Sequence, residues 1–151
     1  MTREIYFLVS AILQNSNNNK QKIGQRISYH LGLNPGPRGA DDGIDGSFED
    51  ESGRFIHFQS KLRSTQLDRS DAREYYSDID YHNADVSIML SGVGFKDTFI
   101  ERLNGQQSIE GVEVHLLQLS DIFENSEAYI NACNSVPELR YLNNEIRMII
   151  D

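Results

Sequence analysis

The fold is decided by residues 41–61, which begin Asp41-Asp42-Gly43-Ile44-Asp45-Gly46 and end Phe55-Ile56-His57-Phe58-Gln59-Ser60-Lys61. The second piece alternates between two faces in the way that a β-strand does, with Ile56 and Phe58 on one face and Gln59 on the other. A short acidic loop containing glycine, residues 49–53, precedes it and suits a hairpin connection. We therefore predict that residues 44–48 form the partner strand.

This hairpin would bring three kinds of side chain together at one rim of a sheet. Asp45 lies near the start of the first strand, and Gln59 and Lys61 lie two positions apart on one face of the second. A carboxylate, an amide oxygen and an ammonium group would then meet there. Such a rim can hold a divalent metal ion and a phosphate group.

The stretch resembles the Mrr-like branch of the PD-(D/E)xK nucleases, which have the restriction-endonuclease fold. The matching residues are Gly39, Asp41, Gly43, Ile44, Asp45, Gly46, Gln59 and Lys61. Gln in place of the usual Glu is typical of that branch. The motif covers about 23 residues, and the order of elements extends the resemblance to roughly residues 20–120. The resemblance implies an α/β fold with a restriction endonuclease-like core and a mixed central sheet.

The resemblance also implies a catalytic set of Asp45, Gln59 and Lys61. Mg²⁺, with Mn²⁺ as a substitute, would be held by the Asp45 carboxylate, the Gln59 side-chain oxygen and the Ser60 backbone carbonyl. Lys61 would orient or deprotonate the attacking water and neutralise charge on the phosphate. Many relatives add an acidic residue from the preceding helix, where this chain offers Gln21 and Gln25.

Further residues are expected to support this site or to bind DNA. Asp41 is a supporting residue or simply part of an Asx-turn, and Gln25 is the second supporting candidate. Arg38, Arg63 and Arg69 flank the motif and are expected to contact DNA. His57 shares a face with Gln59, so it either touches the phosphate or is a hydrogen-bonded histidine within the sheet.

The charge of the chain is unevenly distributed. The net charge of −9 argues against nucleic-acid binding, which usually needs surplus Lys and Arg. Residues 1–75, however, hold ten acidic and ten basic side chains, whereas residues 76–151 hold thirteen acidic and four basic. The acidic excess therefore lies in the second half, and the half with the motif is compatible with DNA.

Length and composition indicate one soluble domain spanning residues 1–151. No run approaches the roughly 18 apolar residues of a membrane span, so no membrane association is expected. Cys133 is the only cysteine, which rules out an internal disulfide and points to a reducing compartment, the cytoplasm.

Periodicity and turn residues predict an alternation of helices and strands around the hairpin, with helices on both faces of a mixed sheet. The predicted helices cover residues 4–14, 20–31 (capped by Asn18 or Asn19), 68–82 (capped by Asp68 or Ser70), 96–103, Ser120 to Cys133, and a last one from Pro137. Two more strands are predicted over residues 84–90 and 112–117, and a shaped loop over residues 34–39.

These features predict a metal-dependent endonuclease that hydrolyses phosphodiester bonds in double-stranded DNA, of restriction or homing type. Cutting both strands needs two sites, so a homodimer or homotetramer is expected. The alternative is a non-catalytic binding or assembly module that keeps the nuclease fold. The net charge and Gln59 favour that alternative, and metal binding distinguishes the two.

Overall fold

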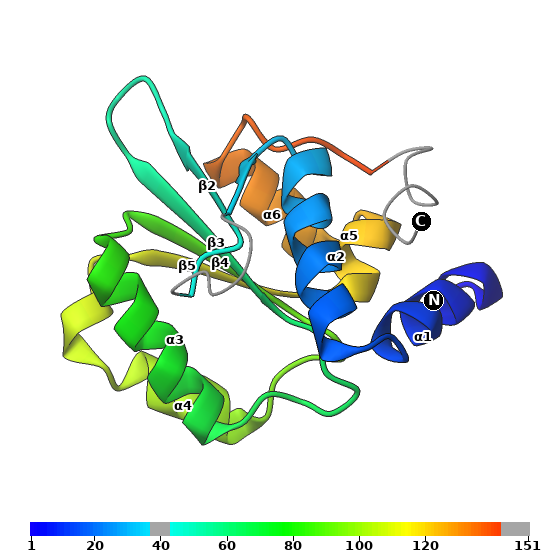
Figure 1. Cartoon of the computed structure of the whole chain (residues 1–151). Helices are drawn as coiled ribbons and strands as arrows, with labels where there is room; N and C mark the ends of the chain where they lie inside the picture. The colour runs from blue at the N-terminus through cyan, green and yellow to red at the C-terminus, as the bar shows by residue number, and fades with distance from the viewer. Residues whose placement is uncertain (37–42, 143–151) are drawn as a thin grey trace.

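A five-stranded mixed sheet forms the middle of the computed structural model, which describes residues 1–36 and 43–142 (Figure 1). The strands lie in chain order across the sheet: β1 (Asn34–Pro35), β2 (Gly46–Glu49), β3 (Phe55–Lys61), β4 (Val86–Ser91) and β5 (Glu113–Gln118). β1, β2 and β3 are antiparallel neighbours, whereas β3, β4 and β5 run parallel. The predicted α/β class and the predicted hairpin of β2 with β3 are confirmed.

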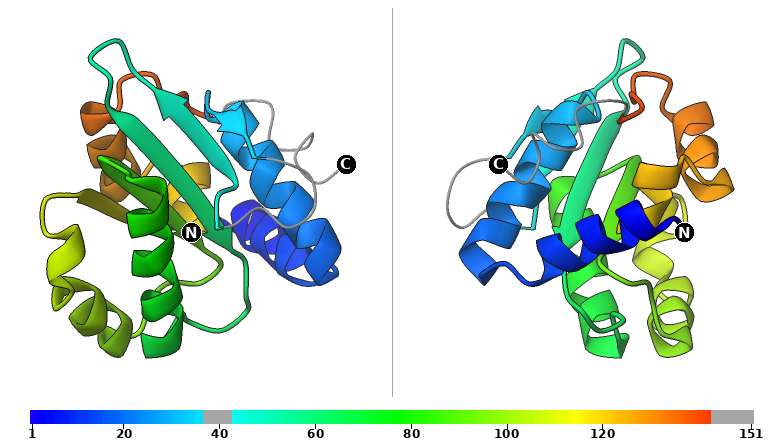
Figure 2. Two further views of the ribbon diagram at one scale, coloured as in Figure 1. Left: turned by 60° about the vertical axis from the view of Figure 1, so that its left-hand side comes forward. Right: turned by 90° about the vertical axis from the view of Figure 1, so that its right-hand side faces the viewer.

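Helices cover both faces of the sheet (Figure 2). One face packs against α1 (Arg3–Leu13), α2 (Asn17–His30), α5 (Leu119–Glu124) and α6 (Glu127–Ser135). The other packs against α3 (Arg69–His82), α4 (Asp97–Asn104) and the short 3-10 helix η1 (Gln107–Ile109). The parallel pairs β3–β4 and β4–β5 require these crossovers, because a tight turn can join only antiparallel strands.

The two faces of β3 have different surroundings. Ile56 and Phe58 are fully buried in the core beneath α1 and α2. His57 and Gln59, on the opposite face, are buried polar residues. Polar side chains in a buried strand need hydrogen-bond partners, so the face with His57 and Gln59 is a candidate for a functional site.

Two predicted helix boundaries are wrong. Ser16, not Asn18 or Asn19, caps α2, since its hydroxyl accepts a hydrogen bond from the Asn19 backbone N–H at 3.2 Å. The helix predicted from Ser120 to Cys133 is two helices, because Asn125 adopts a left-handed conformation with φ of 52°. Ser126 then caps α6.

The last helix, predicted to start at Pro137, does not form over residues 137–142, and the rest of that prediction falls on residues 143–151, outside the described residues. The backbone here makes tertiary contacts instead. The Arg140 N–H donates to the Leu31 carbonyl at 2.8 Å, and the Arg140 carbonyl accepts from the Tyr129 hydroxyl. Leu139 is buried in the core without being helical.

Candidate functional site

The site begins where β2 stops covering the edge of β3. The β2–β3 register ends at Gly46 opposite Phe58, and the Asp45 N–H still donates to the Phe58 carbonyl at 2.8 Å. Beyond that point β3 continues to Lys61 with no β2 residue paired to it among the described residues. The strand edge that is left open belongs to Ser60.

Asp45 occupies this open edge. One of its carboxylate oxygens, Oδ2, accepts from the Ser60 N–H at 2.7 Å and from Ser60 Oγ at 3.0 Å. Its carbonyl accepts from Gly36 N–H at 2.6 Å and from Ser28 Oγ at 3.1 Å. In an extended strand the N–H and C=O of one residue point to the same side. The Ser60 carbonyl therefore faces the same edge as the Asp45 carboxylate.

Helix α2 lies directly against this edge. A Cβ atom at Gly24 would lie only 2.1 Å from Ser60 Oγ and 3.9 Å from Asp45 Cγ. Glycine at this position therefore lets the helix backbone approach the strand closely. The approach buries Asp45, which is 3% exposed.

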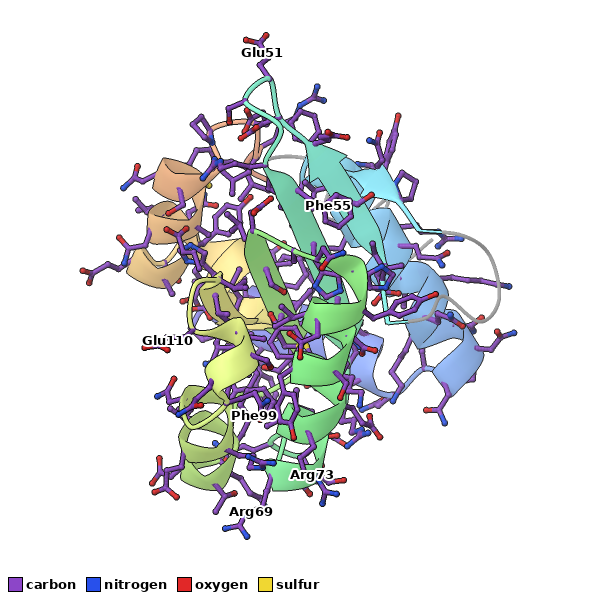
Figure 3. All side chains as sticks on the ribbon, turned by 90° about the vertical axis from the view of Figure 1, so that its left-hand side faces the viewer. Glu51, Phe55, Arg69, Arg73, Phe99 and Glu110 are labelled. Carbon is purple, nitrogen blue, oxygen red and sulfur yellow. The ribbon has the colours of Figure 1, made fainter. Side chains whose placement is uncertain are left out.

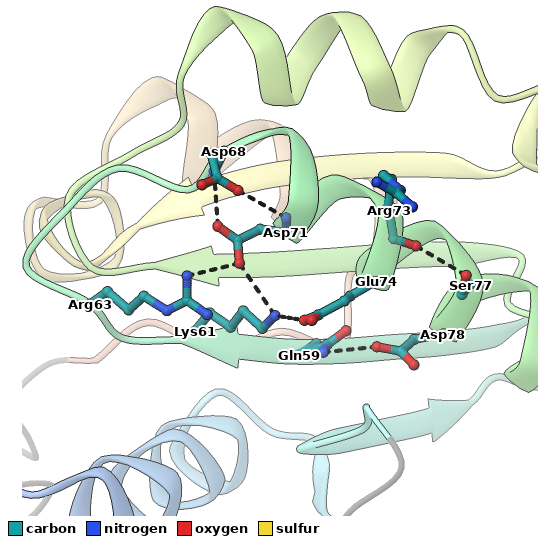
Figure 4. A network of polar contacts seen from close by, with 9 residues as sticks. All are labelled: Gln59, Lys61, Arg63, Asp68, Asp71, Arg73, Glu74, Ser77 and Asp78. Atoms are coloured by element: carbon teal, nitrogen blue, oxygen red, sulfur yellow. Dashed lines mark hydrogen bonds and ion pairs between the residues drawn. The ribbon is translucent and has the colours of Figure 1, made fainter.

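Gln59 points to the opposite face, toward α3. Its Nε2 donates to Oδ2 of Asp78 at 3.0 Å (Figure 4). Its Oε1 is buried and has no hydrogen-bond partner among the described residues. A buried amide oxygen without a partner costs roughly 1–3 kcal/mol, so a ligand bound at Oε1 would remove a cost that the described residues leave.

Asp78 also approaches the turn that precedes β2. A Cβ atom at Gly43 would lie 2.2 Å from Asp78 Cγ, and Gly43 has a φ of 75°, which favours glycine. Partial burial raises the pKa of the Asp78 carboxyl above its usual value, and the hydrogen bond from Gln59 opposes that rise. The carboxylate thus lies between the motif turn and β3.

Lys61 is held by two more acids of α3. Its Nζ pairs with Glu74 and lies 3.5 Å from Oδ1 of Asp71 (Figure 4). Arg63 joins the network, with Nη1 2.8 Å from the same Asp71 oxygen. The resting ammonium of Lys61 is therefore neutralised from within the protein.

Sequence reasoning missed these three acids. Asp71, Glu74 and Asp78 follow the spacing of one helical face. That spacing could have placed them together on α3, but nothing local indicates that this face lies over Gln59 and Lys61.

A cavity of about 270 Å³ joins the predicted catalytic residues. It is lined by Asp45, Gln59, Ser60 and Lys61 together with Asn17, Lys20, Gln21, Leu62 and Arg63. The predicted residues thus share one cavity, although the Gln59 and Lys61 side chains bond to α3 rather than to the carboxylate of Asp45.

His57 is the hydrogen-bonded sheet histidine of the two alternatives. It is fully buried, with Nε2 2.6 Å from the Gly43 carbonyl and Nδ1 2.7 Å from Ser87 Oγ. Because a carbonyl only accepts, Nε2 carries a proton, and in the neutral imidazole Nδ1 accepts from Ser87 Oγ. Ser87 Oγ then accepts from the Tyr75 hydroxyl at 2.5 Å. This series of hydrogen bonds links β3, β4 and α3 to the turn at Gly43.

The remaining predicted residues are placed differently. Arg63 lines the 270 Å³ cavity, whereas Arg69 is exposed on the first turn of α3, at the end of that helix far from the hairpin tip at Glu51 (Figure 3). Gln25 lines a neighbouring cavity of about 560 Å³ with Lys22, Arg26 and Tyr29 of α2. Arg38 and Asp41 lie outside the described residues.

The residues that line the 270 Å³ cavity offer oxygen donors of the types that Mg²⁺ accepts while it keeps several waters. They are the Asp45 carboxylate and the Ser60 carbonyl at the open edge, and the side-chain amide of Gln59 on the face toward α3. Within the described residues no group of three or more His, Cys, Asp or Glu side chains is arranged to hold a metal ion. Any metal here would therefore depend on the amide of Gln59.

The helices in residues 1–36 and 43–142 lack the length and apolar character that crossing a bilayer requires.

Comparison with known proteins identifies no family for this chain. No protein-family model matches the chain. No curated protein matches it either.

Proposed function

We propose that this protein is a Mg²⁺-dependent endodeoxyribonuclease with a restriction endonuclease-like core, which hydrolyses phosphodiester bonds in double-stranded DNA. The observation that carries the proposal is the Oε1 atom of Gln59, which is buried without a hydrogen-bond partner in residues 1–36 and 43–142, in a residue that shares one cavity with Asp45 and Lys61. An unpaired buried oxygen is costly unless it serves a ligand. Together with the Asp45 carboxylate and the Ser60 carbonyl in the same cavity, this oxygen is of a ligand type that suits Mg²⁺ or Mn²⁺.

The residues that line the cavity would have different chemical roles. Asp45, the Oε1 atom of Gln59 and the Ser60 carbonyl would hold the cation. When bound, Mg²⁺ supplies Lewis-acid stabilisation of the phosphate and lowers the pKa of a bound water. Lys61 would exchange its pairing with the exposed Glu74 for the scissile phosphate and neutralise the charge that develops there.

DNA would approach along α2, a surface that supplements the arginines expected from sequence. The helix carries Lys20, Lys22 and Arg26 and has no acidic residue, on a chain whose net charge is −9. Lys22, Arg26 and Tyr29 are exposed one above another, and Lys20 lines the catalytic cavity. Arg63 lines the same cavity and adds a further cation to it. Lys22 and Arg26 would thus bind phosphates next to the one being cut.

An endonuclease of this kind would also have an expected oligomeric state and cellular location. Cleavage of both strands needs two sites, which a homodimer or homotetramer provides. The restriction-type and homing-type roles use the same site chemistry. A cytoplasmic location agrees with the single cysteine, Cys133.

Cleavage of supercoiled plasmid with Mg²⁺ or Mn²⁺ tests the proposal. We expect the parent protein to nick or linearise the plasmid, and Asp45→Ala and Lys61→Ala to lose at least 100-fold of that rate. Lys96→Ala removes a cation from the N-terminus of α4, outside the cavity, and serves as the control. Equal cutting by all four proteins would refute the assignment.

A second candidate is a non-catalytic binding or assembly module with the same fold. It is favoured by the pairing of Lys61 with Asp71 and Glu74, which neutralises the residue that catalysis would need. Metal titration of the melting temperature separates the two. A ligand at 100 times its Kd adds about 2.7 kcal/mol, which corresponds to a rise of roughly 5–10 °C in a chain of this size. An inert module would show no rise.

A further inference from the structure

The side-chain amide of Gln59 presents a problem that Glu at this position would not have. A carboxylate has two equivalent oxygens, whereas an amide has one oxygen and one NH₂ group that repels cations. A chain that uses Gln as a metal ligand must therefore fix which end of the amide faces the cation. This inference rests on the proposed function.

The structure contains a group that fixes it. Oδ2 of Asp78 lies 3.0 Å from Nε2 of Gln59. An ionised carboxylate only accepts hydrogen bonds, so it selects the NH₂ end of the amide and excludes the oxygen. The oxygen is accordingly left buried and without a hydrogen-bond partner among the described residues.

The approach of Asp78 is built into the fold. Any side chain at Gly43 would place its Cβ within 2.2–2.5 Å of the Asp78 carboxyl atoms, so the glycine leaves room for the carboxylate. The helix that carries Asp78 is fixed at its start by a capping box between Asp68 and Asp71. Helix and turn together hold the carboxylate against the amide.

We propose that Asp78 is a positioning residue for cation binding, which locks the Gln59 amide with its oxygen available and supplies, one hydrogen bond away, the negative charge that Gln lacks. A carboxylate that accepts from a ligating side chain orients that side chain and increases its basicity. Asp78 itself would not ligate the cation. Its effect is transmitted through Gln59.

This role predicts a reversal of sign that a purely structural role does not. With Gln at position 59, Asp78→Asn removes the selection and should weaken Mn²⁺ binding by about 10-fold or more. With Glu at position 59, Asp78 becomes a like charge at hydrogen-bond distance. Gln59→Glu alone should therefore bind weakly, and adding Asp78→Asn should restore affinity, because Asn can donate to the new carboxylate.

Calorimetric titration with Mn²⁺ alone, without DNA, measures all four proteins of this cycle. Asp80→Asn is the matched control, since it removes the same charge from the same helix and its Oδ2 contacts only the exposed Ser108 among the described hydrogen bonds. Apo melting temperatures identify variants that do not fold, for which Asp78→Ser takes the place of Asp78→Asn.

The outcomes separate this inference from the proposed function. No Mn²⁺ binding by the parent protein would refute the metal site, and with it both proposals. Binding by the parent protein that Asp78→Asn leaves unchanged, or additive effects of the two substitutions, would refute the role of Asp78 alone. Recovery of affinity in the double variant would support it.

Discussion

At the scale of single residues, Gly24 decides how closely α2 approaches the candidate site. Replacing it with Ala would gain about 1 kcal/mol of helix propensity. The added Cβ would, however, meet Ser60 Oγ at 2.1 Å, and crowding in a packed site costs about 1–3 kcal/mol. We expect Gly24→Ala to lower the free energy of unfolding by about 1 kcal/mol in urea denaturation, despite its better helix propensity.

Two companion variants identify the cause of that loss. Gly111→Ala, at a glycine with no atom within 4 Å of the added Cβ, should stay within about 0.5 kcal/mol of the parent protein. Ser60→Ala in the Gly24→Ala background should recover part of the loss, because it removes the nearest atom. A stabilising Gly24→Ala would show that α2 can move away from the strand.

Asp50 makes the stability of the β2–β3 hairpin depend on pH. Its carboxylate accepts from Arg54 Nε at 2.7 Å, from Arg54 N–H at 2.8 Å and from Ser52 Oγ at 2.7 Å, and the Arg54 side chain leads these bonds in lowering its pKa to about 2. A depressed folded pKa adds stability above the unfolded value of 3.8, and this stability is lost as the pH falls toward 2.

Thermal unfolding of the parent protein and Asp50→Asn tests this dependence. The parent protein should melt higher at pH 6, and the difference in melting temperature should shrink at pH 3, where the unfolded carboxyl is mostly protonated. The Arg54 guanidinium also donates to the Ser135 carbonyl, so the turn is tied to the end of α6. A difference that does not change with pH would show that the Asp50 charge is not what stabilises the turn.

At the scale of elements, the start of α2 depends on Ser16 rather than on the asparagines that follow it. The Ser16 hydroxyl accepts from the Asn19 N–H, whereas Asn18 is exposed in the first turn. Ser16→Ala should cost about 1 kcal/mol of unfolding free energy. Asn18→Ala should be neutral or slightly stabilising, since Ala has the better helix propensity. A larger loss for Asn18→Ala in denaturant titration would contradict the placement of the cap.

Helices α5 and α6 show why one predicted element became two. The segment has helical periodicity throughout, and Asn125 is no stronger a helix breaker than many helical residues. Its left-handed conformation is supported by Ser126, whose N–H and Oγ donate to the carbonyl and side chain of Asp121. The break therefore depends on a hydrogen-bond arrangement rather than on a periodicity signal.

At the scale of the whole molecule, the distribution of charge sets how DNA would bind. The basic face of α2 contrasts with the acidic second half of the chain. Each phosphate contact adds about −0.9 to the slope of log K against log salt. We expect Lys22→Gln with Arg26→Gln to weaken DNA binding and make that slope shallower by about 1.8, as measured by fluorescence anisotropy from low to physiological salt.

Lys96→Gln, which removes a cation from α4, should leave the slope unchanged. An unaltered slope in the α2 double variant would move the DNA away from this face and favour Arg63 and Arg69 as the contacts. If the α2 double variant loses affinity only for short, mismatched or single-stranded DNA, that result would argue against double-stranded DNA as the substrate.

The hairpin of β2 with β3 and the α/β class could be predicted from sequence alone, although β2 covers Gly46–Glu49 rather than residues 44–48. Alternation along β3 and the acidic turn before it are local signals, and strand and helix periods extend over consecutive residues. Asp45, Gln59, Ser60 and Lys61 share one cavity because a hairpin joins neighbouring segments of the chain. These four residues could be identified from the sequence because they lie on adjacent segments of the chain.

The surroundings of those residues depend on packing between distant segments and could not be predicted from the sequence. Asp71, Glu74 and Asp78 reach β3 because the β3–α3–β4 crossover lays α3 over one face of the strand, and Gly24 brings α2 close to its open edge. Such contacts join residues that are ten to forty positions apart, and their geometry depends on packing rather than on any local period. Sequence patterns fix which side of an element is polar, whereas the fold decides which polar sides meet.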